Sequence, residues 1–338
     1  MKKTISAAVA LSIFAAPAIA ANLENPLYMP KQGSVYSKTS AGVMYKIADD
    51  SDAHQLKNHD GATEFPIWRV HEELGYGILD NLEAYAKLGY THDGDIDRKG
   101  IHLGRAGLKY RAINTDDGWV WDLYADAQLG GIVEMSGSYA ANGFTYDNYS
   151  TGRWGFHVGT QVGKTWSKFS TAAFVEVLRT FGNDNNSIEI SELKQIRSIP
   201  PMANIPDEIS VDLKSTTELN AGLKAFYQLD DRWSFGGGFT FKHHADNGVE
   251  GLATSLNSNG NPTIATIQQA FVDGLMPIVE DMNDGFDEYI LNLTAAYQMT
   301  DTMQVAVYGE YTFDESHVNS QNGTDVKAEL GVRLNVQF

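Results

Sequence analysis

Charged residues recur at alternate positions in several stretches of this sequence. Arg105, Lys109 and Arg111 are separated by apolar residues or glycine, and Asp122 and Asp126 are arranged in a similar way. Alternate residues of a strand share one face of a sheet, so these charges are expected to line one surface. Such a surface is either an ion-paired filling of a closed interior or the wall of a water-filled passage for a small polar solute.

The candidate pathway residues are the charged side chains on the polar faces of these stretches. They are Arg69, Arg105, Lys109, Asp122, Asp126, Glu176, Glu329 and Arg333. The basic residues are concentrated between Gly100 and Ala112, and the acidic ones between Trp119 and Leu129 and further along the chain. Basic and acidic walls on opposite sides of a constriction would create a transverse field, which favours dipolar or zwitterionic solutes.

The segments that must position these charges are long stretches of alternating polarity. From Val326 to Phe338 every even-numbered residue is apolar, whereas the odd-numbered ones include Lys327, Glu329 and Arg333. This pattern predicts a strand with one face in an apolar medium and the other in water. Eleven similar stretches precede it, and they begin near Ser34, Ile67, Leu82, Gly100, Trp119, Trp154, Phe169, Leu219, Trp233, Tyr289 and Met303.

The beginning of the chain has the pattern of an export signal. Lys2 and Lys3 precede an apolar run, and Ala18-Ile19-Ala20 has the small residues of a cleavage site. We therefore expect a signal peptide over residues 1–20, a polar periplasmic lead-in with two prolines over residues 21–33, and a single barrel domain over residues 34–338.

The composition excludes several classes of protein. The chain has no cysteine, which rules out a disulfide framework, a thiolate metal site and a lipid anchor on cysteine. Its formal net charge of −18 argues against nucleic acid as a partner. No stretch after the signal has eighteen consecutive apolar residues, as a membrane-spanning helix requires.

Together the stretches predict an all-β fold, a transmembrane antiparallel up-and-down β-barrel of about twelve strands. The connections between them alternate between tight turns and longer loops, as expected for short periplasmic turns and long extracellular loops. Outward aromatic residues are expected to form a ring at each membrane interface. The ring at the turn end comprises Tyr110, Trp119, Phe169, Tyr227, Trp233, Tyr297 and Phe338, and that at the loop end comprises Tyr45, Trp68, Tyr90, Trp154, Phe241, Tyr289 and Tyr311.

The export signal, the alternating segments, the acidic loops and the closing Leu334-Asn335-Val336-Gln337-Phe338 are similar to those of Gram-negative outer-membrane β-barrel proteins of the porin-like kind. This resemblance covers the whole mature chain but is architectural, so it names no solute. It implies an outer-membrane location, contacts with outer-membrane lipids and lipopolysaccharide, and recognition of Phe338 by the barrel assembly machinery.

Two long loops leave alternatives open. The loops over residues 183–217 and 243–286 contain short stretches with helical spacing, at Ile188–Arg197 and Ile264–Met282, so each could plug the pore or cap the rim. The acidic run Asp281–Glu288 lacks the spacing of a defined calcium loop and is read as a solvated loop.

An enzymatic reading of the chain has little support. Lys242 to Gly248 distantly resembles the His-x-Ser-Asn-Gly segment of outer-membrane phospholipases, but Asp246 stands in place of the nucleophilic serine. His243 and His244 are therefore expected to be rim residues, and neither catalysis nor a cofactor is predicted.

The sequence thus predicts a channel for passive diffusion of small polar solutes across the outer membrane. Two alternatives remain. The first is a structural or adhesive surface barrel with a closed lumen, and the second is a barrel lipid hydrolase.

Overall fold

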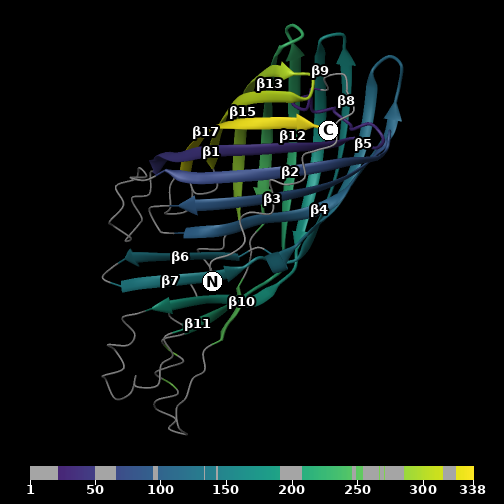
Figure 1. Ribbon diagram of the computed structural model, residues 1–338. Helices are drawn as coiled ribbons and strands as arrows, with labels where there is room; N and C mark the ends of the chain where they lie inside the picture. Colours follow the sequence, from purple (N-terminus) through teal and green to yellow (C-terminus); the bar gives the residue numbers. More distant parts are fainter. Residues whose placement is uncertain are drawn as a thin grey trace.

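A computed structural model of the chain forms a closed antiparallel sheet (Figure 1). The structure describes residues 22–49, 66–93, 98–132, 134–141, 144–190, 208–245, 249–253, 266, 270, 285–314 and 325–338. The predicted signal peptide lies outside these residues, as does most of the stretch 264–282. Among the described residues, no helix is long and apolar enough to cross a membrane.

Twelve strands make up the barrel, which confirms the predicted fold. They are β1 (Val35–Asp49), β2 (Ile67–Leu79), β3 (Leu82–Asp93), β4 (Arg98–Asn114), β5 (Trp119–Gln128), β8 (Gly155–Trp166), β9 (Phe169–Thr180), β12 (Thr216–Gln228), β13 (Trp233–His244), β15 (Phe286–Thr300), β16 (Met303–Asp314) and β17 (Asp325–Gln337). Each pairs with the next in this order, and β17 pairs with β1 from Tyr36–Gln337 to Asp49–Asp325. Closure leaves the barrel sheet without a free edge.

One end of the barrel carries tight turns. Asp80 and Asn81 connect β2 to β3, Ser167 and Lys168 connect β8 to β9, and Asp301 and Thr302 connect β15 to β16. The last residue lies at this turn end, where the Phe338 amide donates to the Val35 carbonyl at 2.8 Å. The connections at the opposite loop end include the undescribed residues, so their predicted lengths stay a prediction.

Five further strands extend the sheet beyond β4. They are β6 (Glu134–Ala141), β7 (Phe144–Thr151), β10 (Asn183–Ile190), β11 (Glu208–Leu213) and β14 (Val249–Ala253), with the short 3-10 helix η1 (Gly130–Ile132) before β6. The pairing runs from β4 through β6, β7, β10 and β11 to β14, and Figure 1 shows β6, β7, β10 and β11 side by side.

These added strands correct two predictions from the sequence. No strand is predicted between the stretches that begin at Trp119 and Trp154, and the spacing in Ile188–Arg197 predicts a short helix. In the structure, β6 and β7 form a hairpin and Ile188–Ile190 belongs to β10. The backbone groups of these strands form hydrogen bonds with strands from other connections of the barrel. The pattern of residues within one connection does not reveal such pairing. Asn142-Gly143, between two β-prone runs, was nevertheless a hairpin signal in the sequence.

The two faces of the barrel have opposite character. Large aliphatic side chains are exposed on the outside, including Leu293 (72 %), Leu330 (66 %) and Leu223 (62 %). Inside, charged groups are buried, with Asp122 fully buried. Of the aromatic residues predicted to form the two rings, those that are exposed are Tyr45, Trp68, Tyr90, Tyr110, Trp119, Trp154, Phe169, Tyr227, Trp233 and Tyr311.

Two irregularities in the sequence pattern have different structural causes. In β4, Ile101 and Leu103 are out of phase with the residues after them because the pairing with β3 skips His102, which is a β-bulge. Glu72 in β2 falls on the outward face with no shift in the pairing to β1. Its carboxylate accepts hydrogen bonds from Ser37, at 2.6 Å, and from Thr39 on β1, so the neighbouring strand, rather than a bulge, accommodates this charge.

Candidate solute pathway in the barrel lumen

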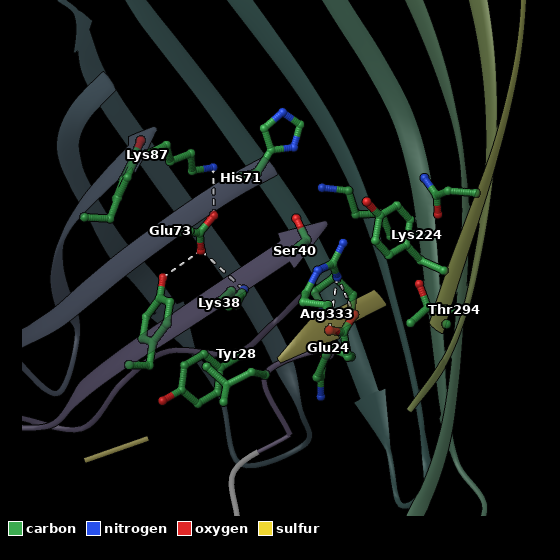
Figure 2. A pocket seen from close by; sticks show the side chains of 18 of the residues that line it. Glu24, Tyr28, Lys38, Ser40, His71, Glu73, Lys87, Lys224, Thr294 and Arg333 are labelled. Carbon is green, nitrogen blue, oxygen red and sulfur yellow. Dashed lines mark hydrogen bonds and ion pairs between the residues drawn. The ribbon is translucent and has the colours of Figure 1, made fainter. Parts of the chain in front are cut away.

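The lumen contains a cavity of about 500 Å³ that side chains from most of the barrel strands line (Figure 2). Its lining is mainly charged groups, tyrosines and amides. Among its residues are Arg69 and Glu73 of β2, Lys224 of β12, and Glu329 of β17. The inward positions of the alternating strands therefore converge on one polar space.

The eight candidate residues of the sequence analysis all lie on inward positions of the barrel strands. Arg69, Arg105, Lys109, Glu176, Glu329 and Arg333 line the cavity itself, whereas Asp122 and Asp126 are buried behind it in β5. Their role in solute passage stays a prediction.

The basic residues of β4 are paired with acidic residues of adjacent strands. Lys109 lies 3.4 Å from Glu83, Arg105 lies 4.0 Å from Asp126, and Arg111 donates to both carboxylate oxygens of Asp122 at 2.8 and 3.0 Å. These charges are thus neutralised locally. The expected basic wall on β4 does not stand free opposite an acidic wall.

A second group of charges connects β1, β2 and β3. The Glu73 carboxylate lies 3.3 Å from Lys38 and 3.2 Å from Lys87, and it accepts a hydrogen bond from the Tyr36 hydroxyl at 2.9 Å (Figure 2). Tyr36 also donates to Glu83. One carboxylate therefore holds two lysines against the wall of the lumen.

His157 of β8 joins two acidic residues. Its Nδ1 lies 2.7 Å from Asp126 and its Nε2 lies 3.5 Å from Glu176. Tyr85 donates to Asp126 at 2.7 Å and Tyr124 donates to Glu176 at 2.6 Å. The group resembles a catalytic relay only in its His–carboxylate contact, because none of these contacts involves a serine or threonine hydroxyl. We read it as a structural network.

Residues 22–33, which we call the N-terminal segment, lie inside the turn end of the barrel. The Glu24 side chain is buried there, and Arg333 donates to its two carboxylate oxygens at 3.0 and 2.8 Å (Figure 2). Asn335 donates to the same carboxylate at 2.7 Å. Asn22 donates to Gln228 at 2.8 Å and to Ser234 at 2.9 Å.

Side chains of the barrel also form hydrogen bonds with the backbone of the N-terminal segment. The carbonyls of Pro26, Leu27 and Tyr28 accept from Gln161 at 3.1 Å, Arg111 at 2.7 Å and Lys109 at 2.8 Å. The Leu27 side chain packs with Val120 and Ala172 in a small apolar cluster.

Tyr28 extends from the N-terminal segment into the lining of the cavity. Burial and the nearby Glu83 carboxylate raise the pKa of Tyr28 above its ordinary value, so its hydroxyl stays protonated at neutral pH.

The sequence did not reveal where the N-terminal segment lies. It predicted only a polar lead-in, and considered the long outer loops as candidate plugs. Glu24 and Arg333 are far apart in the sequence, and a contact between such residues leaves no periodic pattern of polarity. The segment narrows the lumen at the turn end, and the cavity described above lies against it.

The two histidines at the end of β13 contact carboxylates. His243 lies 2.6 Å from Asp287, and His244 lies 3.2 Å from both Glu218 and Glu288. Asp246 lies outside the described residues. Within the described part of the chain, no group of three or more His, Asp or Glu residues is arranged to hold a metal ion.

Comparisons with known proteins agree with this geometry at the level of the fold. No protein-family model and no curated protein matches the chain. Among solved structures, the outer membrane channel from Pseudomonas putida F1 has a TM-score of 0.55 and 11% identity, over 94% of this chain and 99% of that one. The beta domain of the Bordetella autotransporter BrkA has a TM-score of 0.47 and 11% identity, over 91% of this chain and 100% of that one. This chain therefore has the fold of outer-membrane β-barrel proteins.

Proposed function

We propose that this protein is an outer-membrane channel for the passive diffusion of small polar solutes. The observation that supports this most directly is a cavity of about 500 Å³ lined by charged and hydrogen-bonding side chains within a barrel that is apolar outside. Exposed aliphatic residues around a barrel are unfavourable in water but suit a lipid environment. A polar interior in the same barrel offers a path for solutes that lipid excludes.

The same proposal places the turn end on the periplasmic side and the loop end outside the cell. Residues 1–20 act as the export signal, and Phe338, at the turn end, is accessible for recognition by the assembly machinery. The outer surface contacts lipid and lipopolysaccharide. Proteolysis of intact cells, which should cleave the loop end and spare the turn end, tests this orientation.

A structural barrel with a closed lumen is the second candidate. The position of the N-terminal segment favours it, because Glu24 and Leu27 are buried among lumen residues at the turn end. Enzymatic activity is not proposed, because Asp246 stands in place of the nucleophilic serine that a lipid hydrolase of this kind requires. Lipase activity that disappears in His244→Ala would overturn this view.

Conductance of the purified protein in planar lipid bilayers distinguishes the two candidates. A channel gives stepwise current, whereas a closed barrel gives none at any applied voltage. Liposome swelling with sugars, amino acids and nucleosides then defines the range of solutes. Absence of both current and swelling from folded protein would reject the channel.

A further inference from the structure

Two charged residues of the cavity lining differ from the others because they have no ion-pair partner. Lys224 of β12 and Glu310 of β16 make no hydrogen bond or ion pair within the described part of the chain. The Lys224 ammonium lies 4.3 Å from the centre of the Phe174 ring. Every other lysine, arginine and glutamate of the lining forms an ion pair.

Strand pairing places these two residues in one row across the wall. Lys224 is opposite Gly238, Gly238 is opposite Asn292, and Asn292 is opposite Glu310. Three strand spacings therefore separate their backbones, which is at most about 14 Å. Both residues line the cavity, so both charges face the lumen.

The wall between Lys224 and Glu310 is a recess. Gly236 and Gly238 occupy inward positions of β13 and add no side chain to it. A Cβ built on Gly236 would meet nothing closer than 3.8 Å, whereas at Gly238 the Asn292 amide already lies 3.1 Å away, so the open part of the recess is at Gly236. The hydroxyl of Thr294 borders the recess (Figure 2), as does the amide of Asn292, and both can hydrogen-bond to a solute.

The other charges near the recess are paired at both of its ends. Near Lys224, Lys38 and Lys87 pair with Glu73, and Lys109 pairs with Glu83. Near Glu310, Glu329 pairs with Arg69 and Glu288 pairs with Lys242. Lys224 and Glu310 are therefore the unpaired cation and the unpaired anion at the two ends of the recess.

We propose that Lys224 and Glu310 form a binding site for a zwitterionic solute of amino-acid size. The solute carboxylate pairs with Lys224, its ammonium pairs with Glu310, and the glycines of β13 leave room for its carbon chain. An unpaired charge in a partly buried site has an unfavourable desolvation free energy. A bound zwitterion pairs with both charges and so offsets this free energy at both residues. This site rests on the proposed channel function, because it lies on the path through the lumen.

The test uses γ-aminobutyrate as the zwitterion and erythritol as an uncharged compound with four carbons. Saturation-transfer NMR on detergent-solubilised full-length protein measures binding, and liposome swelling measures passage. We expect γ-aminobutyrate, but not erythritol, to bind. Lys224→Met and Glu310→Gln should each weaken this binding about tenfold, the ratio expected for about 1.4 kcal/mol.

Two further variants complete the design. The exchange Lys224→Glu with Glu310→Lys should restore binding, because a zwitterion can bind in the reverse direction. Lys242→Met removes a lumen lysine that Glu288 already neutralises at 3.4 Å and should leave binding unchanged. Heat-modifiable electrophoretic mobility confirms that each variant is folded.

The possible results separate the site from the channel. Bilayer current with no binding of γ-aminobutyrate, or binding that persists in both single variants, overturns the site and leaves the channel in place. Binding of butyrate equal to that of γ-aminobutyrate, lost in Lys224→Met alone, also overturns it in favour of an anion site. Specific binding without any current supports the site and rejects the channel.

Discussion

The buried charges of the lumen depend on individual partners from adjacent strands. Asp122 is fully buried, and its carboxylate accepts two hydrogen bonds from Arg111 and one, at 2.8 Å, from Gln161. Arg111 also holds the Leu27 carbonyl of the N-terminal segment. A single guanidinium thus joins β4, β5 and the segment inside the barrel.

Removing this guanidinium should destabilise the barrel strongly. We expect Arg111→Met to lower the free energy of unfolding by about 3–5 kcal/mol, because it leaves a buried carboxylate without its cation. Urea unfolding in lipid vesicles measures the change. Lys164→Met is the matched control, since its partner Asp117 is exposed and water screens the pair, so its loss should have a much smaller effect. Equal effects of the two substitutions would contradict the argument.

The turn between β12 and β13 should respond to pH through Asp230. Its carboxylate accepts the amides of Trp233 at 2.7 Å and Arg232 at 2.8 Å, and these hydrogen bonds lower the pKa of Asp230 from its ordinary value of 3.8. The ionised group therefore stabilises the folded state above pH 3.8, and this stabilisation is lost as the pH falls through the lowered pKa.

Asp230→Ala should accordingly reduce the unfolding midpoint at pH 7, with a difference from the wild type that shrinks as the pH is lowered below 3.8. Unfolding curves of both proteins at a series of pH values measure this. A difference that is constant over the whole range would show that the carboxylate charge is not responsible.

At the scale of elements, the N-terminal segment is the part that most affects the lumen. It is held by the side chains of Arg333, Asn335, Gln161 and Arg111, from several different strands. At the end of the segment, the Gly33 amide donates a hydrogen bond to the Gly77 carbonyl of β2 at 2.8 Å, so this end is anchored to the rim of the barrel. The segment can therefore be shortened without disturbing the strand that follows it.

Deletion of residues 22–30 should widen the turn end. We expect a larger single-channel conductance than that of the wild type, or current that appears only in the deletion if the segment closes the pore. Planar-bilayer recording measures both. Glu24→Gln, which keeps the segment but weakens its ion pair with Arg333, should give an intermediate result. Conductance unchanged by the deletion would show that the constriction lies elsewhere.

For the whole molecule, the contrast between the apolar outside and the polar inside decides where the barrel is stable. Leu293 lies at the middle of β15 and is 72 % exposed. In water, a polar residue at such a site has little effect, but in a bilayer the same position faces hydrocarbon.

Leu293→Arg therefore tests the membrane environment directly. We expect a loss of about 2–4 kcal/mol in lipid vesicles, whereas Leu229→Arg, at the rim beside the β12–β13 turn, should cost about 0–1 kcal/mol. Urea unfolding in vesicles compares the two. Similar small effects at both positions would argue against a lipid-facing surface at β15.

The barrel could be predicted from the sequence alone, because the alternation within each strand shows which residues face lipid and which face the lumen. The strands predicted from Ser34 to Phe338 all exist, and β17 closes the barrel by pairing with β1. Local alternation is sufficient here, since a one-residue shift would move every side chain to the wrong face. The same rule placed the eight candidate residues on inward positions.

The tertiary structure was needed to identify the unpaired charges of the lumen and the segment that lies inside it. Arg105 and Arg111 looked like part of a free basic wall, yet Asp126 and Asp122 neutralise them from the next strand. Lys224 and Glu310 were not distinguished by their sequence context, because pairing depends on the register of several strands at once. The N-terminal segment reaches the lumen through contacts between residues about three hundred positions apart, which no local pattern records.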